Sequence, residues 1–392
     1  MDMLLDPSIC INFRNVINKS PLFISDETYK VHYNLFCAVM DRLDTSIEYI
    51  NNHPEPPKTE ENLLSCLMFS CMVIDGVKLV LSSLDIQSDF VDEKKEESCK
   101  FFKKTCLGFP LNILKEEFPT DDKFFEYIRS VAFAHPFKTN RPKFFKKDEI
   151  QYSPWVIANT RIMGLRGISD GIGVRLYSNM FDGVQDLIFS FDILKNYLRS
   201  RYEQLEKATN KLNEILHENE KEWKTQKVNR SLLPIDTLKK IAEVLQSRYE
   251  STSTLDDAIL YLEYMHTKPE NTKAVSFYKE AIVKSIPDLC DATDSLDYEK
   301  SEDILLGILR AEPKKMYPLA NYHLEKIYTY LTDYSGESNV AYGKKQAELF
   351  SNEFARKWVN IIPNEMSFTE IQLLVSAACY LEKENQEKEL SL

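Results

Sequence analysis

The N-terminal part of the chain carries a hydrophobic pattern with the period of an α-helix. Across residues 25–50, apolar side chains recur at steps of three and four, which places them on one face of a helix of about seven turns. Ser25, Asp26 and Glu27 suit the start of this helix, because a capping residue and acids favour its positive end. The apolar stripe comprises Tyr29, Tyr33, Phe36, Met40, Leu43, Ile47 and Ile50.

A second helix is predicted for residues 59–84, which are apolar on nearly every side after an opening threonine and two glutamates. Asp75 and Lys78 interrupt this apolar run, and a lipid bilayer would penalise both charges. We therefore expect a buried helix at the centre of a bundle and no membrane partner. The N-terminus is acidic where a signal peptide is basic, so no secretion signal is expected.

A third helix is predicted to be capped by Asp121 and Asp122 and to end at His135, because Pro136 disfavours helical geometry in the residue before it. The pattern then changes, since five of the ten glycines lie within residues 148–183. The segments VIA at 156–158 and VRLYS at 174–178 resemble short strands. We expect a β-hairpin or small sheet inserted into a helical domain.

From Val184 the helical period returns and continues to Leu216 in a heptad-like seam, which predicts a helix of about 35 residues. The seam favours two interpretations equally, a dimer interface or the last helix of the bundle. Its members are Val184, Leu187, Phe191, Leu194, Leu198, Leu205, Leu212 and Leu216.

The polar stretch at residues 220–231 is the predicted domain boundary. It divides a helical bundle with a β insertion, residues 1–225, from an all-α domain, residues 232–392. The second domain is expected to consist of stacked helix pairs, because segments of about 12–20 residues alternate with short connections. The predicted breaks are near 250–254, 267–271, 291–297, 311–316, 333–339 and 362–367.

The composition of the chain argues against several classes of enzyme and binding protein. The low glycine content and the lack of phosphate-loop motifs argue against Rossmann and P-loop enzymes. Eight cysteines without a CxxC spacing indicate a reducing, cytoplasmic setting, and the histidines show no metal-binding spacing, so neither metal nor cofactor is expected. The net charge of −12 argues against a general nucleic-acid binder, so any such contact requires a local basic patch.

One such patch follows the third helix. Residues 135–147 contain five lysines and arginines, three phenylalanines and no acid. Basic side chains pair with phosphates, and aromatic rings stack on unpaired bases. His135 lies where the helix ends, and a histidine there is suited to proton transfer. On a straight α-helix Arg129 and His135 would lie about 120° apart and about 9 Å along the axis, so one chain would not easily direct both at one atom.

The stretch from Arg129 and Ser130 to His135 resembles the R-polar-x(3–4)-H signature of the HEPN superfamily (higher eukaryote and prokaryote nucleotide-binding). The motif lies on a late helix of a predicted bundle, as it does in that superfamily. The resemblance implies a HEPN-like helical bundle and a metal-independent endoribonuclease of the toxin or anti-phage type, acting on tRNA or other RNA. It also implies a homodimer in which two motifs face one cleft, which would resolve the geometric problem.

The resemblance implies a role for each candidate residue. His135 would move protons at the ribose 2′-hydroxyl and the leaving oxygen, and Arg129 would stabilise charge on the scissile phosphate. Ser130 and Glu126 would be supporting residues. The residues expected to bind flanking RNA phosphates are Lys138, Arg141 and Lys143.

A second hypothesis is a non-catalytic helical interaction or scaffold module. In that case Arg129 would pair with Glu126 one turn away, and His135-Pro136 would only end a helix. In either case the C-terminal domain is expected to regulate the first, to recognise a protein or nucleic-acid trigger, or to contribute to assembly.

Overall fold

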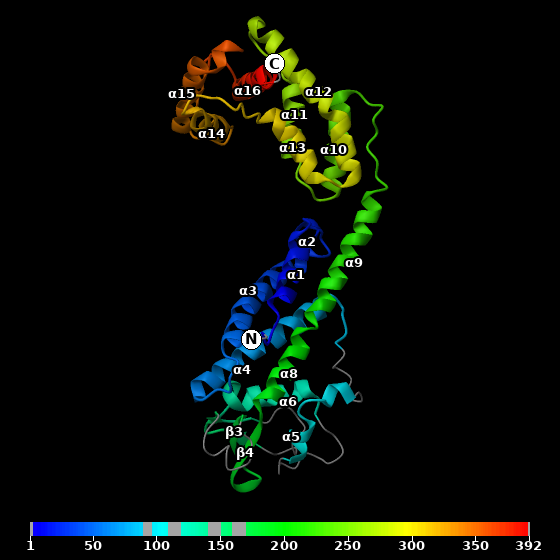
Figure 1. Cartoon of the computed structure of the whole chain (residues 1–392), viewed down its shortest axis with the longest axis vertical. Coiled ribbons are helices and arrows are strands. Elements are labelled where there is room, and N and C mark those ends of the chain that lie inside the picture. Colours follow the sequence, from blue (N-terminus) through cyan, green and yellow to red (C-terminus); the bar gives the residue numbers. More distant parts are fainter. Residues whose placement is uncertain (1–2, 89–95, 109–118, 140–149, 159–169, 391–392) are drawn as a thin grey trace. The chain divides into compact units, whose positions relative to one another are not determined.

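The chain divides into two compact units, Met1–Leu216 and His217–Leu392, in a computed structural model (Figure 1). The division falls inside a helix, because α9 runs from Leu205 to Trp223, whereas the sequence suggested a boundary within residues 220–231. The structure describes residues 3–88, 96–108, 119–139, 150–158 and 170–390.

The first unit is mainly helical, as predicted, with a small antiparallel sheet. Helices α3 and α4 pack against one another, and α4 also contacts α6, α8 and the sheet, so α4 is central to the unit. The bounds of the helical elements are α1 Pro7–Asn18, α2 Leu22–Ser25, α3 Lys30–Asn52, α4 Glu60–Ser83, η1 Glu96–Cys99, α5 Lys103–Gly108, α6 Asp121–Arg129, η2 Ser130–Ala134 and α8 Phe191–Tyr202.

The central helix α4 confirms the predicted helix at residues 59–84. Thr59 caps it, because its hydroxyl accepts the N–H of Asn62. Among the described residues, α4 is the one helix long and apolar enough to cross a membrane, yet 56% of its most apolar window is buried inside the structure. Such burial is typical of a core helix in a bundle.

The N-terminal helices differ from the pattern-based expectation. The predicted helix at residues 25–50 begins only at Lys30, because Ser25 ends α2 and the Asp26 carboxylate binds the N–H of Thr28 in a turn. The preceding helix α1 was not predicted. Asp6 caps it and Pro7 opens it, a combination that suits a helix start.

The sheet extends beyond the predicted insertion. Its central strand β3 (Gly171–Ser178) pairs with β4 (Phe181–Ser190) on one edge and with β1 (Gln151–Tyr152) and β2 (Val156–Ile157) on the other, all antiparallel. The two predicted strand segments fall on β2 and β3. Residues 184–190 form a strand rather than the start of a long helix, because their apolar positions also fit the alternation of a strand and β3 pairs with them.

The predicted 35-residue helix is therefore two shorter ones, α8 and α9. The leucines of the seam are buried within the chain: Leu194, Leu198, Leu205 and Leu212 all have less than a tenth of their surface exposed. They already pack against their own chain, so the dimer-interface interpretation of this seam is wrong and the bundle interpretation is correct.

Gly173 gives a stability prediction for the sheet. A Cβ at this position would lie 1.9 Å from the backbone oxygen of Leu187 on β4, which no side-chain movement can relieve. We expect Gly173→Ala to lower the free energy of unfolding by about 3 kcal/mol or more. Gly307→Ala on α13 (Tyr298–Leu309) meets no atom within 4 Å and should instead stabilise its helix by about 1 kcal/mol. Thermal unfolding of the full chain measures the stability of both variants. Equal midpoints for Gly173→Ala and Gly307→Ala would contradict the close approach of β3 and β4.

The second unit consists of helices, as the sequence predicted, and the six predicted breaks fall between them or at their ends. One further break, at Phe354 after α15, was not predicted. The apolar faces of these helices form one continuous core. Besides α13, the bounds are α10 Pro234–Ser247, α11 Ser253–Glu263, η3 Pro269–Asn271, α12 Thr272–Ser295, α14 Ala320–Tyr330, α15 Glu337–Glu353, η4 Ala355–Lys357 and α16 Phe368–Leu390.

A buried arginine joins helix ends in this second unit. Arg248 follows α10 and is 0% exposed. Its guanidinium donates to the carbonyl of Thr293 near the end of α12 at 2.7 Å, and to those of Trp223 and Gln226 at 2.8 and 3.0 Å. The carbonyls at a helix C-terminus have no partner within their helix and carry partial negative charge, so a cation satisfies and stabilises them.

The cysteines give a second prediction. Cys37 and Cys99 are partly exposed and the other six are buried. Burial raises the pKa of Cys106 and of Cys379 to about 12 and that of Cys66 to about 11, which suppresses the reactive thiolate. Under native conditions iodoacetamide should modify Cys37 and Cys99 first, and the rest only in urea. Peptide mass spectrometry reads the sites, and early modification of Cys106 would contradict the described packing.

Candidate functional site

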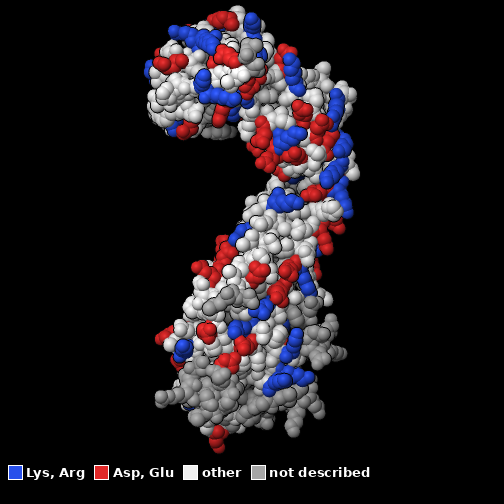
Figure 2. All heavy atoms as spheres, in the orientation of Figure 1, with Lys and Arg blue, Asp and Glu red and all other residues white. Residues whose placement is uncertain are grey.

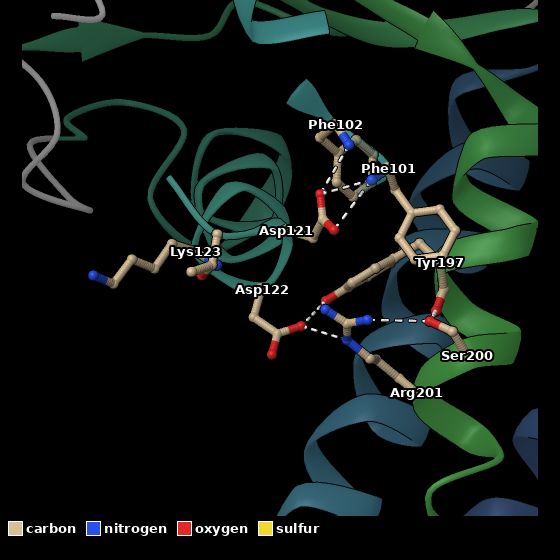
Figure 3. A network of polar contacts seen from close by, with 9 residues as sticks. Phe101, Phe102, Asp121, Asp122, Lys123, Tyr197, Ser200 and Arg201 are labelled. Atoms are coloured by element: carbon tan, nitrogen blue, oxygen red, sulfur yellow. Dashed lines mark hydrogen bonds and ion pairs between the residues drawn. The ribbon is translucent and has the colours of Figure 1, made fainter. Parts of the chain in front are cut away.

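The helix that carries the Arg129 motif is anchored first through Asp121 (Figure 3). The buried carboxylate of Asp121 accepts the N–H of Phe101 at 3.1 Å and that of Phe102 at 2.8 Å. Burial raises the pKa of the Asp121 carboxyl, and these two N–H groups oppose that rise. The start of α6 is thereby fixed to the segment before α5.

Asp122 makes the second anchor, to α8. One carboxylate oxygen of Asp122 accepts the hydroxyl of Tyr197 at 2.8 Å and the Nε of Arg201 at 2.7 Å, as Figure 3 shows. The Arg201 guanidinium lies 4.6 Å from the centre of the Tyr197 ring, and both side chains are buried. Asp121 and Asp122 do not cap α6, contrary to prediction: the hydroxyl of Thr120 caps it by accepting the N–H of Lys123, which leaves both carboxylates for tertiary contacts.

Arg129 anchors the other end of α6. Its Nη1 lies 2.7 Å from Oδ2 of Asp75 on α4, with the two side chains 39% and 54% exposed. Arg129 thus pairs with Asp75 rather than with Glu126, which points to solvent. An ion pair this exposed stabilises the fold by less than about 1 kcal/mol. The other N–H groups of the guanidinium remain geometrically able to bind an anion.

The helix between Arg129 and His135 is not regular. Residues Ser130–Ala134 form one π-helical turn, closed by a 2.7 Å hydrogen bond from the N–H of His135 to the carbonyl of Ser130, five residues earlier. The 120° separation expected for a straight α-helix therefore does not apply. A π turn is rare and costs regular hydrogen bonding, and such turns occur frequently at functional sites.

The chain after His135 is held by the sheet. Thr139 pairs through its backbone with Gln151 of β1, and the carbonyl of Pro136 accepts the N–H of Ser153 at 2.7 Å. The hydroxyl of Thr139 also donates to the carbonyl of His135. The side chain of Gln151 also accepts the hydroxyl of Tyr127, which lies on α6. The β insertion thus fixes the backbone of the segment that begins with His135.

The predicted site residues differ in exposure. His135 and Lys138 are exposed, and Phe137 between them is 83% exposed, although a large apolar ring is normally buried. Ser130 is buried and contributes its carbonyl to the π turn, while Glu126 is exposed. Arg141 and Lys143, with most of the basic tract, lie outside the described residues.

The described surface is of mixed charge. Figure 2 shows acidic and basic side chains interspersed over the visible face of the second unit. In the described parts of the chain no cluster of three or more His, Cys, Asp or Glu side chains has the arrangement of a metal site. The chemistry available around residues 129–138 is therefore that of a guanidinium, an imidazole, an ammonium and an exposed ring.

Sequence reasoning missed the residues that hold this arrangement. Asp75 was recognised only as a charge inside an apolar helix, and Arg201 was not recognised at all. Arg201 carried a signal, because a charge among the apolar positions of a helix requires a partner when it is buried, whereas Asp75 is exposed and required none. The sequence gives no way to name that partner, which lies 54 residues away for Asp75 and 79 residues away for Arg201.

Comparisons with protein-family models, with curated proteins and with solved structures found no match to this chain.

Proposed function

We propose that the chain is a HEPN-type endoribonuclease that cleaves RNA without a metal or other cofactor. One observation carries the proposal. An arginine and an exposed histidine flank a π turn at the end of a helix that is anchored at both ends. A π turn costs regular helical hydrogen bonding, and this one, buried at Ser130–Ala132, lies between two side chains suited to phosphate binding and proton transfer.

In the proposed reaction His135 removes the proton of a ribose 2′-hydroxyl or returns one to the leaving 5′-oxygen. Attack of the 2′-oxygen on phosphorus forms a 2′,3′-cyclic phosphate and releases a 5′-hydroxyl end. Arg129 stabilises the charge on the phosphate. To do so, its guanidinium either releases Asp75 or binds Asp75 and the phosphate at the same time. Phe137 offers a face for base stacking and Lys138 a phosphate contact, as Arg141 and Lys143 would.

The proposal includes a homodimer in which two such sites share one cleft, since acid and base are most simply supplied by two histidines. A toxin or anti-phage role in the cytoplasm, with tRNA among the targets, belongs to the same proposal. The second unit would regulate this activity or bind a protein or nucleic-acid trigger.

The first test is cleavage of total tRNA by the purified full chain with a chelator present. The proposal expects cleavage products that end in 2′,3′-cyclic phosphate and that are absent with His135→Ala. Equal cleavage by the two proteins would exclude His135 as the catalyst, and loss of cleavage with the chelator would indicate a metal-dependent nuclease instead.

A non-catalytic interaction module remains the second candidate, and the Arg129–Asp75 ion pair favours it. In that reading Arg129 only joins α6 to α4. Exchanging the pair, Asp75→Arg with Arg129→Asp, separates the two candidates. The exchanged variant keeps an ion pair between α4 and α6 and so keeps the structural role. It moves the guanidinium from residue 129 to residue 75, away from the position that the proposed catalysis requires.

A further inference from the structure

The small sheet of the first unit carries large aromatic side chains on its outer side. Ile172, Val174 and Leu176 of β3 are buried and face the core. Because side chains alternate along a strand, Arg175 and Tyr177 face outward. The solvated side of an antiparallel sheet is usually polar, whereas the Tyr177 side of this one presents a ring that is 40% exposed.

Two further rings lie on the same side as Tyr177. Tyr152 of β1 is the direct partner of Tyr177 in the register of the sheet and is 38% exposed. Side chains of directly opposite residues start about 5 Å apart, so these two rings are neighbours. Trp155, between β1 and β2, is 43% exposed, and the guanidinium of Arg175 lies 5.1 Å from the centre of its ring. We call Tyr152, Trp155 and Tyr177 the aromatic face.

Arg175 holds the Trp155 ring in place. Its Nε and Nη2 donate to the two carboxylate oxygens of the buried Asp186 at 2.7 and 2.9 Å, which fixes the guanidinium and balances its charge. The backbone N–H of Arg175 also donates to the carbonyl of Trp155 at 3.1 Å. A ring that is already ordered loses little conformational freedom when a ligand stacks on it.

The aromatic face is continuous with the proposed catalytic residues. Thr139 and Gln151 form an antiparallel bridge and are both buried. Their neighbours Lys138 and Tyr152 therefore lie opposite one another on the outer side. The N–H of Lys138 donates to the carbonyl of His135 at 3.3 Å. A ligand on the aromatic face thus lies next to the segment that carries the proposed catalytic histidine.

The charge of this part of the chain suits a polyanion. Residues 135–190, which comprise the sheet and the basic tract, contain eight lysines and arginines and five acids, a net charge of +3 in a chain of −12. Flat rings beside basic side chains favour the bases of a nucleic acid. The bases of a duplex already stack on one another, so only unpaired bases can stack on the aromatic face.

We propose that the aromatic face binds single-stranded RNA by stacking unpaired bases on Tyr152, Trp155 and Tyr177, and that it thereby selects single-stranded segments for the site at His135. RNA as the ligand rests on the proposed ribonuclease function, but the binding itself requires no catalysis. Cross-strand aromatic pairs also stabilise a sheet, so the experiment has to separate binding from stability.

A labelled oligouridylate of 2′-O-methyl nucleotides is a suitable probe, because it lacks the 2′-hydroxyl that the proposed cleavage needs. Fluorescence anisotropy measures its binding to the full chain, alone and annealed to a complementary strand. We expect saturable binding of the single strand, tighter than that of the duplex by roughly tenfold or more, as the stacking of one base implies. Attraction to phosphates alone would instead favour the duplex, whose charge density is higher.

Four variants locate the binding. Tyr177→Ile and Tyr152→Ile keep a side chain suited to a strand but remove the ring, and each should weaken single-strand binding by roughly tenfold. Trp155→Leu, which lies outside the strands, should do the same. Tyr177→Phe keeps the ring and should retain the affinity. Thermal unfolding confirms that each variant is folded at the temperature of the titration.

Tyr334→Ile is the matched control. Tyr334 is a fully exposed tyrosine between α14 and α15 in the second unit, so its replacement should leave binding unchanged. Unchanged affinity in the Tyr177, Tyr152 and Trp155 variants, equal or tighter binding of the duplex, or no saturable binding would each overturn the inference. Self-association that is lost in Tyr177→Ile, without RNA binding, would also overturn it and assign the aromatic face to a second copy of the chain.

The outcome for this face is distinct from the outcome for the proposed ribonuclease. Ring-dependent binding of the single strand without any RNA cleavage would support the aromatic face and contradict the catalytic proposal. Cleavage that requires His135 but is equally fast in Tyr177→Ile and Tyr152→Ile, on single-stranded and on paired RNA, would do the reverse.

Discussion

Replacing His135 with alanine is expected to lower the rate of RNA cleavage by roughly 10²–10⁴-fold, the usual contribution of a positioned proton-transfer group. Arg129→Ala should lower it by roughly 10²–10³-fold, as the loss of one donor to a charged transition state does. Neither change removes a buried contact, since His135 is exposed and Arg129 makes one solvent-accessible ion pair. Unfolding of both variants should therefore stay within about 1 kcal/mol of wild type.

Matched controls exist for each residue. His217 on α9 is an exposed histidine and Arg42 on α3 an exposed arginine, and neither side chain forms a hydrogen bond or ion pair within the described residues. His217→Ala and Arg42→Ala should leave cleavage unchanged. Initial rates on a labelled RNA, measured with a chelator present, compare all four variants with wild type.

Two changes at Asp75 separate the role of the Arg129 side chain from that of its ion pair. Asp75→Asn keeps Arg129 in place and should preserve cleavage, because the guanidinium then has no competing carboxylate. The exchanged pair, Asp75→Arg with Arg129→Asp, should recover stability but not cleavage. Recovery of cleavage by the exchange would show that the ion pair, and not the arginine itself, matters, and would favour the interaction module.

The largest effect on stability is expected at Arg248 in the second unit. Arg248→Met keeps a long apolar side chain but removes the guanidinium from three carbonyl groups, of which those of Trp223 and Thr293 keep one backbone N–H each. Losing three hydrogen bonds from a buried charged donor should lower the free energy of unfolding by about 3–5 kcal/mol. Urea unfolding of the full chain, followed by tryptophan fluorescence, measures the change, because Trp223 belongs to the affected region.

Arg230→Met is the control for Arg248. Arg230 is half exposed and forms ion pairs with Asp291 and Asp294 at 2.8 and 2.9 Å, so its loss should cost less than about 1 kcal/mol. Arg248→Lys should fall between the two, because a single ammonium keeps the charge but not the forked geometry that reaches three carbonyls. Equal midpoints for Arg248→Met and Arg230→Met would show that the buried contacts contribute little.

The sequence by itself determined most of the helical segments, although not α1, and where many of them end. A helix needs only its own periodic apolar face, a capping side chain such as Thr59, and a stop signal, all of which are local. For the same reason the breaks of the second unit were predictable. The candidate pair Arg129 and His135, with the basic tract after it, was also visible as a local pattern in an acidic chain.

Only the tertiary structure decided the rest, because the deciding contacts join residues far apart in the chain. Residues 184–190 fit both periods, and pairing with β3 made them a strand. The leucine seam fits a dimer or a core, and burial within the chain assigned it to the core. Asp75 became the partner of Arg129, and Asp122 the partner of Arg201, when distant helices packed together. No periodicity encodes such contacts.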